Sequence, residues 1–390
     1  MNNTNFIESN KMYLDVITPI NIASNEKLDV IDYLYDNKSK IAYFLNPLLW
    51  HKFIYHKGLF SAYMNFINDK AKSRKILYEW LSKHDYSIKD IEQTVKYKLT
   101  AHLDINKLDK KNLNNIILQT KLVDGRAYIP GSTIKGIIRT AILYDLLQKN
   151  PYLKEKYWQS LVDVMNKHTK SFEKRKVDRA FEKEIKSIEN ELEEILTAKI
   201  ENTKDGKYSF MQGIKISDAL PEFESNKLSL LQKIDIVIKN TGIKENELSV
   251  YRECIEPQMR FYFDIQLETA YKKFLNINSI DDILVMLKNF FEANNKLLIS
   301  AFGRDYGFLF NNADLSNIYI GGGTGFLTKT LVAYIAPTDI EAKKFISKYL
   351  NMKFGKRKII PDIKLAPRTL KATRYNNKLM LMGMAKIARV

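Results

Sequence analysis

Apolar and polar residues alternate over Met12–Ile17 and Met259–Leu267, and this period of two predicts a strand in each stretch. Thr18-Pro19 ends the first strand, because proline cannot donate to a sheet ladder. Apolar residues recur at helical spacing through much of 41–100. Shorter patterns predict strands over Tyr208–Ile216, Leu230–Lys239, Ile318–Ile320, 370–374 and 378–387, and helices over Ile280–Asn294, Leu297–Phe302 and 339–350. The chain therefore mixes strands and helices throughout.

Residues 153–201 differ from the rest, because Glu and Lys recur there at spacings of three and four. This pattern predicts a long, solvated helical hairpin inserted into the first part of the chain. A polar stretch around Asn240–Glu247, which contains Gly242, marks the boundary between two halves. We expect a first domain over 1–240, with the insertion at about 153–201, and a second domain over 248–390.

The first half contains the stretch Pro130–Thr140, a Pro-Gly turn that leads into an apolar helical pattern. We expect Ser132 or Thr133 to cap this helix, and the remaining free N–H groups at its positive end suit a phosphate. Lys135 and Arg139 are four residues apart and share a face near that end. Gly136 would let another backbone come close, and Gly131 forms the turn. The alternative is an ordinary capped helix with one apolar face.

The second half contains four glycines within five residues, directly after a short predicted strand. They are Gly321, Gly322, Gly323 and Gly325, and Lys329 follows them. The stretch differs from the phosphate-binding Walker loop, because Thr328 stands where that loop needs its second glycine. The glycines still suit a loop whose N–H groups approach a sugar-phosphate backbone. The alternative is a flexible connection between a strand and a helix.

Both halves thus combine strands, a glycine-containing turn and a helix start with basic residues. This organisation fits an α+β fold with two ferredoxin-like domains, the βαββαβ arrangement of RNA-recognition modules. The aromatic-rich signature of the usual RNA-recognition sheet is not found, so we expect recognition by another route than stacking on sheet aromatics.

The charge of the chain is strongly positive and unevenly placed. Of the formal net charge of +17, residues 341–390 carry +12, from fourteen Lys and Arg against Glu341 and Asp362, whereas 151–205 is close to neutral. A localised basic surface attracts polyanions, nucleic acid above all, although lysine-rich composition alone gives a solubilising surface. No apolar run is long enough to cross a membrane, and the N-terminus lacks the pattern of a signal peptide. The lone Cys254 excludes an internal disulfide, and we expect a cytoplasmic protein without a metal or other cofactor.

Chemistry-bearing residues are sparse in both glycine motifs. Acid–base cleavage of RNA needs a histidine paired with Lys, Tyr or a second His, and none of the five histidines lies in either motif. A metal-dependent nuclease needs clustered carboxylates. The candidates Asp218, Asp264, Asp305 and Asp314 are dispersed, although folding can gather some of them.

Taken together, these motifs resemble the RAMP superfamily of CRISPR effector proteins, and more narrowly the Csm-family subunit that caps the 3′-end side of the guide RNA in type III-A complexes. The Pro-Gly-Ser-x-Ile-Lys-Gly block is the most specific of them. The similar segments are Tyr13–Ser24, Tyr128–Thr140, Ile214–Asp218, Arg252–Pro257, Gly321–Thr330 and Leu365–Ile387.

The resemblance implies two RRM-like domains, binding of guide RNA (crRNA), contacts to neighbouring Csm backbone subunits, and no nuclease chemistry of its own. It leaves maturation of the guide's 3′ end to recruited host nucleases. We expect Lys135 and Arg139 to contact guide phosphates. Two other functions stay open at this point: a RAMP-family endoribonuclease that processes the repeat transcript, and, more remotely, a phosphate-loop enzyme that depends on Lys329.

Overall fold

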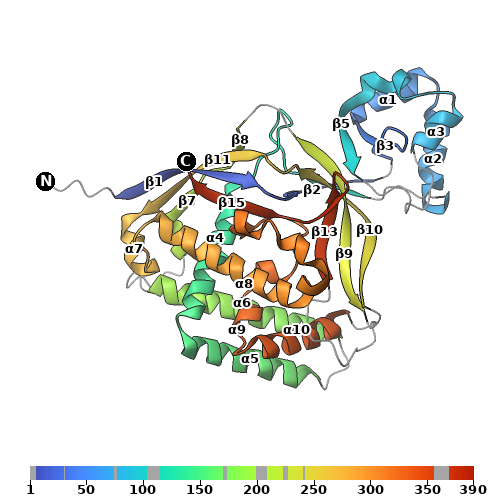
Figure 1. Ribbon diagram of the computed structural model, residues 1–390. Helices are drawn as coiled ribbons and strands as arrows, with labels where there is room; N and C mark the ends of the chain where they lie inside the picture. Colours follow the sequence, from blue (N-terminus) through green and yellow to red (C-terminus); the bar gives the residue numbers. More distant parts are fainter. Residues whose placement is uncertain are drawn as a thin grey trace.

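A computed structural model of the chain shows two β-sheets and several layers of helices (Figure 1). The structure describes residues 6–29, 31–73, 77–102, 115–169, 174–198, 209–222, 227–239, 242–354 and 369–390. Tyr208, the tripeptide Lys356-Arg357-Lys358 and residues 365–368 of the last family-like segment therefore lie outside the described residues.

The first sheet has six strands, and its centre joins the two ends of the chain. Strand β1 lies between β15 and β11, and the order along the sheet is β12-β15-β1-β11-β7, with β8 also paired to β11. The strands are β1 (Ile7–Val16), β7 (Ile214–Ile216), β8 (Leu220–Pro221), β11 (Arg260–Glu268), β12 (Ile318–Tyr319) and β15 (Met384–Arg389). The predicted strands at 12–17 and 259–267 are confirmed.

Two long helices, α4 (Gly131–Gln148) and α8 (Ile280–Tyr306), pack on one face of this sheet (Figure 1). Along the chain the elements run β1, α4, β7, β11, α8, β15, and the strands lie in the order β15-β1-β11-β7 with antiparallel neighbours. This is the βαββαβ arrangement of a ferredoxin-like sheet. Met12, Leu14 and Val16 are buried on the helix side, which explains the alternation in the sequence.

Helix α8 is continuous where the sequence predicts two helices. The predicted break falls at 295–296, where the polar side chains of Asn294 and Asn295 interrupt the apolar pattern. Both side chains are buried: Asn294 donates to the Phe290 carbonyl over 2.9 Å, and the Tyr319 hydroxyl donates to Asn295 Oδ1 over 2.5 Å. Each side chain thus makes a hydrogen bond inside the protein and the helix continues, although Asn294 Oδ1 has no partner among the described residues.

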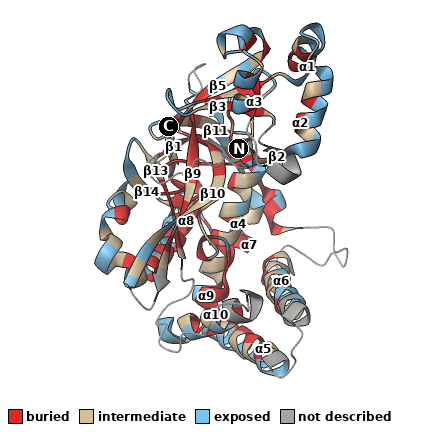
Figure 2. Ribbon diagram, turned by 90° about the vertical axis from the view of Figure 1, so that its right-hand side faces the viewer, coloured by how far each residue is buried: buried red, intermediate tan, exposed pale blue. Residues whose placement is uncertain are grey.

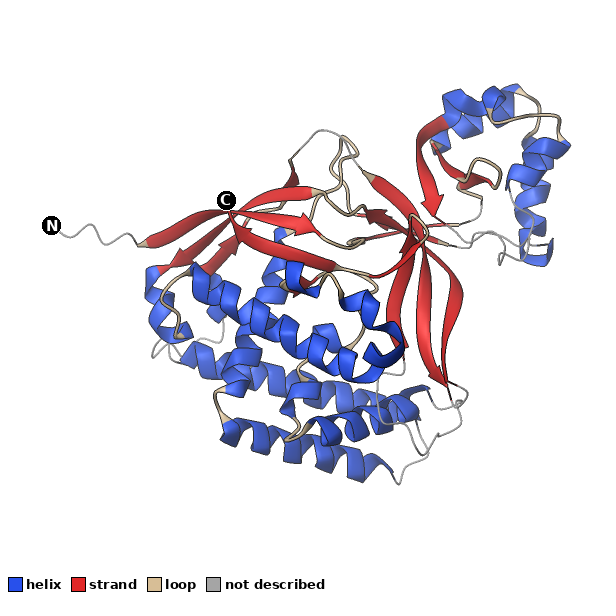
Figure 3. Ribbon diagram, in the orientation of Figure 1, coloured by secondary structure: helices blue, strands red, loops and turns tan. Residues whose placement is uncertain are grey.

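The second sheet has nine strands and stands beside the first (Figure 3). Its main path is β2-β6-β10-β9-β5-β4-β3, and β13 pairs with both β9 and β14. The strands are β2 (Ala23–Leu28), β3 (Tyr33–Asp36), β4 (Ile41–Leu45), β5 (Val95–His102), β6 (Ile116–Gln119), β9 (Leu228–Lys239), β10 (Gly242–Ile255), β13 (Thr369–Tyr375) and β14 (Lys378–Leu381).

Both sheets take strands from either side of residues 240–248, where β9 and β10 form an antiparallel pair. The division into domains 1–240 and 248–390, each ferredoxin-like, stays a prediction. The predicted strand at 208–216 is shorter than expected. Residues Phe210–Gly213 form a 3₁₀ turn, and only Ile214–Ile216 pair with β11.

The helical hairpin predicted at 153–201 is present as α5 (Pro151–Thr169) and α6 (Lys174–Ala198), but it is not simply solvated. One face of the hairpin is buried against α10 (Asp339–Phe354) and α4. Phe181 stacks on Tyr349 with ring centroids 4.0 Å apart. The charged residues of the hairpin dominate its sequence, so the narrow apolar stripe on its buried face is hard to recognise from the sequence.

A smaller unit with its own core projects from the second sheet (Figures 1 and 2). It consists of α1 (Pro47–His56), α2 (Phe60–Ser73) and α3 (Leu77–Lys83) beside β3 and β4. The rings of Trp50, Tyr63 and Trp80 pack together inside it. The remaining described helices are α7 (Thr269–Leu275) and α9 (Val332–Ile335).

Candidate nucleic-acid interface

The short segment Thr18–Ile22 leaves β1 and connects the two sheets. Ile20 forms an antiparallel bridge with Ile255, with N···O distances of 3.1 and 2.7 Å. The Gly383 N–H donates to the Pro19 carbonyl over 2.9 Å. This segment therefore lies between β10, the end of the chain and, as described next, the glycine-rich loop.

The glycine-rich loop docks on this connecting segment through its backbone. Gly322 donates its N–H to the Asn21 carbonyl over 2.6 Å. Gly321, Gly323 and Gly325 have φ values of +86°, +84° and +103°, in the left-handed region where a side chain causes strain. The N–H groups of Gly323, Gly325 and Phe326 form no hydrogen bond with any residue that the structure describes. The loop thus presents backbone donors, as the sequence leads us to expect.

Arg252 and Lys329 place two positive charges beside this loop. Arg252 donates through Nη1 to Asn21 Oδ1 over 2.8 Å, and a Cβ on Gly322 would lie 2.5 Å from the same nitrogen. Burial lowers the pKa of Arg252, and burial together with the charge of Arg252 lowers the pKa of Lys329. Among the described carboxylates, none forms an ion pair with either side chain. Two neighbouring cations without a counter-charge favour an anion.

A buried carboxylate supports the strand that carries Arg252. Glu253 is fully buried, accepts the Gln119 N–H over 2.9 Å and forms an ion pair with Lys121 at 2.5 Å. Burial raises the pKa of Glu253, while Lys121 and the Gln119 N–H oppose this shift. The Lys121 ammonium also lies 3.9 Å from the centre of the Tyr97 ring. Glu253 and Lys121 balance each other, so they leave the charge of Arg252 and Lys329 uncompensated.

The start of α4 differs from the expected capped helix. The cap residue is Pro130, and neither Ser132 nor Thr133 caps the helix with its side chain. The Gly131 N–H donates to Asp218 Oδ1 over 2.8 Å, and the Thr133 and Ile134 N–H groups donate to the Pro130 carbonyl. The anion site predicted at this helix end is thus largely filled by the protein itself, because a carboxylate satisfies the dipole.

The glycine that permits a close approach in this motif is Gly131 rather than Gly136. A Cβ on Gly131 would lie 2.5 Å from the Ile216 carbonyl oxygen, whereas a Cβ on Gly136 would meet nothing within 4 Å. Gly131 therefore lets the helix begin against β7.

The two cations of this motif also differ from each other. Arg139 forms ion pairs with Glu189, at 3.4 Å, and with Glu193, both on α6. It connects α4 to the helical hairpin, so its guanidinium is not free for RNA in this conformation. Lys135 forms no ion pair with a described residue, and burial and the nearby Lys215 lower its pKa. Of the predicted pair, only Lys135 is available to an anion.

The two glycine-containing motifs thus differ in which of their charged groups are paired. Asn21 and Arg252 are functional candidates that the sequence analysis did not name as site residues, although both lie in segments that carry the family resemblance. The sequence gives little signal for Arg252, because β10 carries other charged residues such as Lys244, Glu245 and Glu253. The convergence with Gly322 could only come from the fold.

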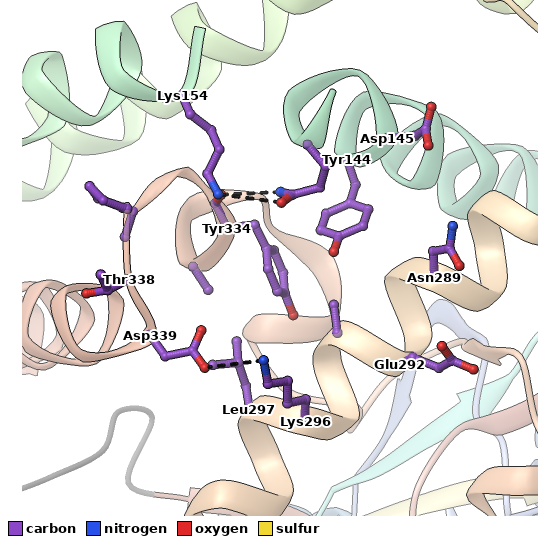
Figure 4. Close-up of a pocket in the computed structure, with 15 residues that line it drawn as sticks. Tyr144, Asp145, Lys154, Asn289, Glu292, Lys296, Leu297, Tyr334, Thr338 and Asp339 are labelled. Carbon is purple, nitrogen blue, oxygen red and sulfur yellow. Dashed lines mark hydrogen bonds and ion pairs between the residues drawn. The ribbon is translucent and has the colours of Figure 1, made fainter. Parts of the chain in front are cut away.

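A cavity lies elsewhere, between α4, α8, α9 and the start of α10 (Figure 4). It has a volume of about 650 Å³, and its walls include Tyr144 and the buried Tyr334. Its lining carries two lysines, Lys154 and Lys296, and three carboxylates, of which Asp339 lies 4.0 Å from Lys296 Nζ. None of the residues predicted to bind RNA lines it, and its charge does not favour a polyanion.

The basic C-terminal region is partly neutralised inside the fold. Arg374 forms ion pairs with Glu245 and Glu247, Lys371 with Asp235 at 2.9 Å, and Arg389 with Glu8 and Asp281. The excess charge of 341–390 is thus not all available to a ligand. Among the described residues no group of three or more His, Cys, Asp or Glu side chains could hold a metal ion, and no helix is both long and apolar enough to cross a membrane.

Comparison with known proteins gives consistent results. The family model of the RAMP superfamily matches residues 13–385. The chain is 23% identical to "CRISPR system Cms protein Csm5" of Enterococcus italicus, over 92% of this chain and 90% of that protein. It is 25% identical to the protein of the same name from Streptococcus thermophilus, over 82% of this chain and 79% of that protein.

Two solved structures share the fold at low sequence identity. One chain of a Csm–crRNA–target RNA ternary complex of a type III-A CRISPR-Cas system, solved by cryo-EM, has a TM-score of 0.59 at 18% identity and covers 98% of this chain and 100% of its own length. The crystal structure of T. onnurineus Csm5 has a TM-score of 0.58 at 17% identity, with coverages of 96% and 99%. Because the family model matches residues 13–385, nearly the whole chain, the chain belongs to the RAMP superfamily.

Proposed function

We propose that this chain is a non-catalytic crRNA-binding subunit of a type III-A CRISPR interference complex. It caps the 3′-end side of the guide, contacts neighbouring Csm backbone subunits and supports maturation of the guide by recruited host nucleases. Curated relatives named Csm5 and the fold shared with a chain of a Csm–crRNA–target RNA complex support this assignment. Two ferredoxin-like, RRM-like domains belong to the same proposal.

The observation that carries the RNA-binding part is the cation pair beside the glycine loop. Arg252 and Lys329 lie together without a described carboxylate partner, and the Gly323 and Gly325 N–H groups are free of described acceptors. A guide phosphate supplies the missing negative charge and accepts from the loop. Ser132 and Lys135 add a second, weaker contact at the start of α4.

The test compares two lysines that carry the same charge in different surroundings. Lys329→Ala is expected to weaken binding of single-stranded RNA and to lower the slope of log K against log salt by about 0.7, the value for one lost phosphate contact. Lys296→Ala removes an exposed lysine of the cavity in Figure 4, whose Nζ lies 4.0 Å from Asp339, and should leave the slope unchanged. Equal slopes in the two variants would contradict the phosphate contact.

The 3′-side position is tested in the assembled complex. Reconstitution with and without this chain, followed by digestion with a 3′-exonuclease, should show the guide's 3′ segment protected only when the chain is present. Protection that is independent of the chain would remove the capping role while leaving RNA binding intact.

One observation favours the second candidate, an endoribonuclease. His102 lies beside Tyr375, with ring centroids 4.9 Å apart, and the Tyr375 hydroxyl donates to Glu256 Oε2 over 3.0 Å. Burial lowers the pKa of His102, which keeps the imidazole neutral but also makes it a weaker base. However, its Nδ1 already accepts the Asn376 N–H at 3.4 Å. Metal-independent cleavage of repeat RNA that is lost in His102→Ala would establish this candidate over the first.

The phosphate-loop enzyme has less support. Thr328, at the place of the required glycine, is buried and its hydroxyl donates to Thr324 Oγ1 over 3.0 Å. Lys329 ends a 3₁₀ turn of three residues rather than starting a long helix. ATP turnover that depends on Lys329 remains the measurement that would support it.

A further inference from the structure

The face of the first sheet opposite α4 and α8 carries a row of polar and aromatic side chains. Met12, Leu14 and Val16 of β1 point toward the helices, so the residues between them point the other way. In Figure 1 the helices that pack on this sheet all lie on one side of it. The opposite face therefore lacks a covering helix among the described elements.

Two tyrosines meet at the centre of this face. Tyr13 on β1 lies directly opposite Tyr262 on β11, and these are the two inner strands of the βαββαβ sheet. They are 249 positions apart in the sequence, so no local aromatic motif contains both of them. For this reason the sequence alone predicts no stacking on sheet aromatics.

Each ring already has a cation above it. The Arg260 guanidinium lies 4.2 Å from the centre of the Tyr13 ring and donates to both carboxylate oxygens of Asp15, at 2.6 and 2.8 Å. The Lys11 ammonium lies 5.3 Å from the centre of the Tyr262 ring. The two hydrogen bonds to Asp15 fix the plane of the guanidinium, and a fixed guanidinium plane is itself a surface on which a base can stack.

We propose that this face is a stacking platform for unpaired bases of single-stranded RNA, formed by Tyr13, Tyr262 and Arg260. The inference rests on the proposed RNA-binding function and adds a third, separate contact, which binds the faces of the bases rather than the phosphates. In four-stranded RNA-binding sheets, aromatic side chains on the sheet surface stack two or three bases. The matched positions on the inner strands give this chain the same geometry.

Aromatic surface and continuity favour RNA as the occupant. Lys11, Arg260 and Lys386 surround the rings, against Asp15, Asp264 and Glu222, which accepts the Tyr262 hydroxyl over 2.8 Å. Lys386 lies opposite Asp15 on β15. Lys215 on β7, at the edge of the same sheet, is close enough to Lys135 to lower its pKa. The platform is thus continuous with the lysine at the start of α4. A protein interface instead has a core that is depleted of charge.

The balanced charge around the two rings gives the platform a distinct signature. Stacking is expected to supply most of its free energy, so removing the rings should weaken binding while hardly changing the salt dependence. This behaviour differs from that of the Arg252 and Lys329 site, where the salt dependence changes. The salt dependence of RNA binding therefore distinguishes loss of the platform from loss of the phosphate contact.

The experiment measures binding of the full chain to a labelled oligouridylate and to an abasic oligoribonucleotide of the same length. The double variant Tyr13→Leu with Tyr262→Leu should bind oligouridylate about tenfold more weakly, or worse, with an unchanged salt slope. Its affinity for the abasic strand should equal that of the natural chain. Tyr13→Phe with Tyr262→Phe keeps both rings and should bind oligouridylate normally.

Three results would overturn the proposal. The first is equal binding of oligouridylate by the leucine and phenylalanine variants. The second is a loss of affinity for the abasic strand by the leucine variant that equals its loss for oligouridylate. The third is normal RNA binding by a leucine variant that no longer assembles with neighbouring subunits, which assigns the face to a protein. If Lys329→Ala lowers the salt slope while the leucine variant binds normally, the platform fails and the proposed function stands.

Discussion

The start of α4 and the glycine-rich loop look alike in the sequence and differ in the fold. Each combines glycine with nearby cations after a strand. At α4 the protein supplies its own anion, because Asp218 accepts the Gly131 N–H, and Arg139 is paired with Glu189 and Glu193. At the loop no described carboxylate pairs with Arg252 or Lys329.

A sequence pattern typical of phosphate binding shows which N–H groups and cations are present. It does not show whether other groups of the protein already pair with them. In α4 the glycine allows the helix to pack closely on β7, since Gly131 lies against the Ile216 carbonyl. In the loop three glycines adopt left-handed φ values and turn the chain around Asn21. The charged groups of the first motif are thus mostly paired within the protein, whereas the cations beside the second have no described carboxylate partner.

The largest effect is expected at Gly131. Gly131→Ala places a Cβ 2.5 Å from a backbone oxygen that cannot move independently, and should lower the free energy of unfolding by about 1–3 kcal/mol. Gly136→Ala in the same helix has open space and should raise it by up to about 1 kcal/mol. Urea denaturation of both variants checks the contrast, and equal midpoints would show that Gly131 has no special role.

An intermediate effect is expected at Gly322, whose φ is not in the left-handed region. Gly322→Ala places a Cβ 2.5 Å from Arg252 Nη1, the end of a flexible side chain, so the guanidinium moves and the fold persists. RNA affinity should fall about tenfold, since a charged contact is lost. Gly307→Ala has no atoms within 4 Å of its Cβ and provides the control. A drop in melting temperature with unchanged affinity would argue that Arg252 is structural.

The smallest effect separates Lys135 from Arg139. Lys135→Ala should weaken RNA binding a few-fold and lower the salt slope by about 0.7. Arg139→Ala should leave the slope unchanged and lower the free energy of unfolding by about 0.5–1 kcal/mol, because half-exposed ion pairs to α6 are lost. If Arg139→Ala changes the slope as much as Lys135→Ala, the guanidinium leaves α6 when RNA binds, and the two motifs are more alike than this conformation shows.

Local pattern determined a large part of this protein. Alternation located β1 and β11, helical spacing located α4, α8 and the α5–α6 hairpin, and the glycine pattern located the loop with left-handed φ values. The Pro-Gly-Ser-x-Ile-Lys-Gly block and the glycine loop were enough for the RAMP superfamily, which the family match over 13–385 confirms. These features depend on neighbours within a few turns of chain.

Tertiary structure decided which of these residues meet and which of them stay free. The pairing of β1 with β15, the bond from Arg252 to Asn21 and the opposition of Tyr13 and Tyr262 each join residues more than 200 positions apart. Asp218, 87 positions from Gly131, fills the helix end that the sequence left open. Hydrophobic periodicity states which face of an element is buried, but not which element buries it. Long-range packing makes that choice, and it paired the charged groups of one of two similar motifs while leaving the cations beside the other without a described carboxylate partner.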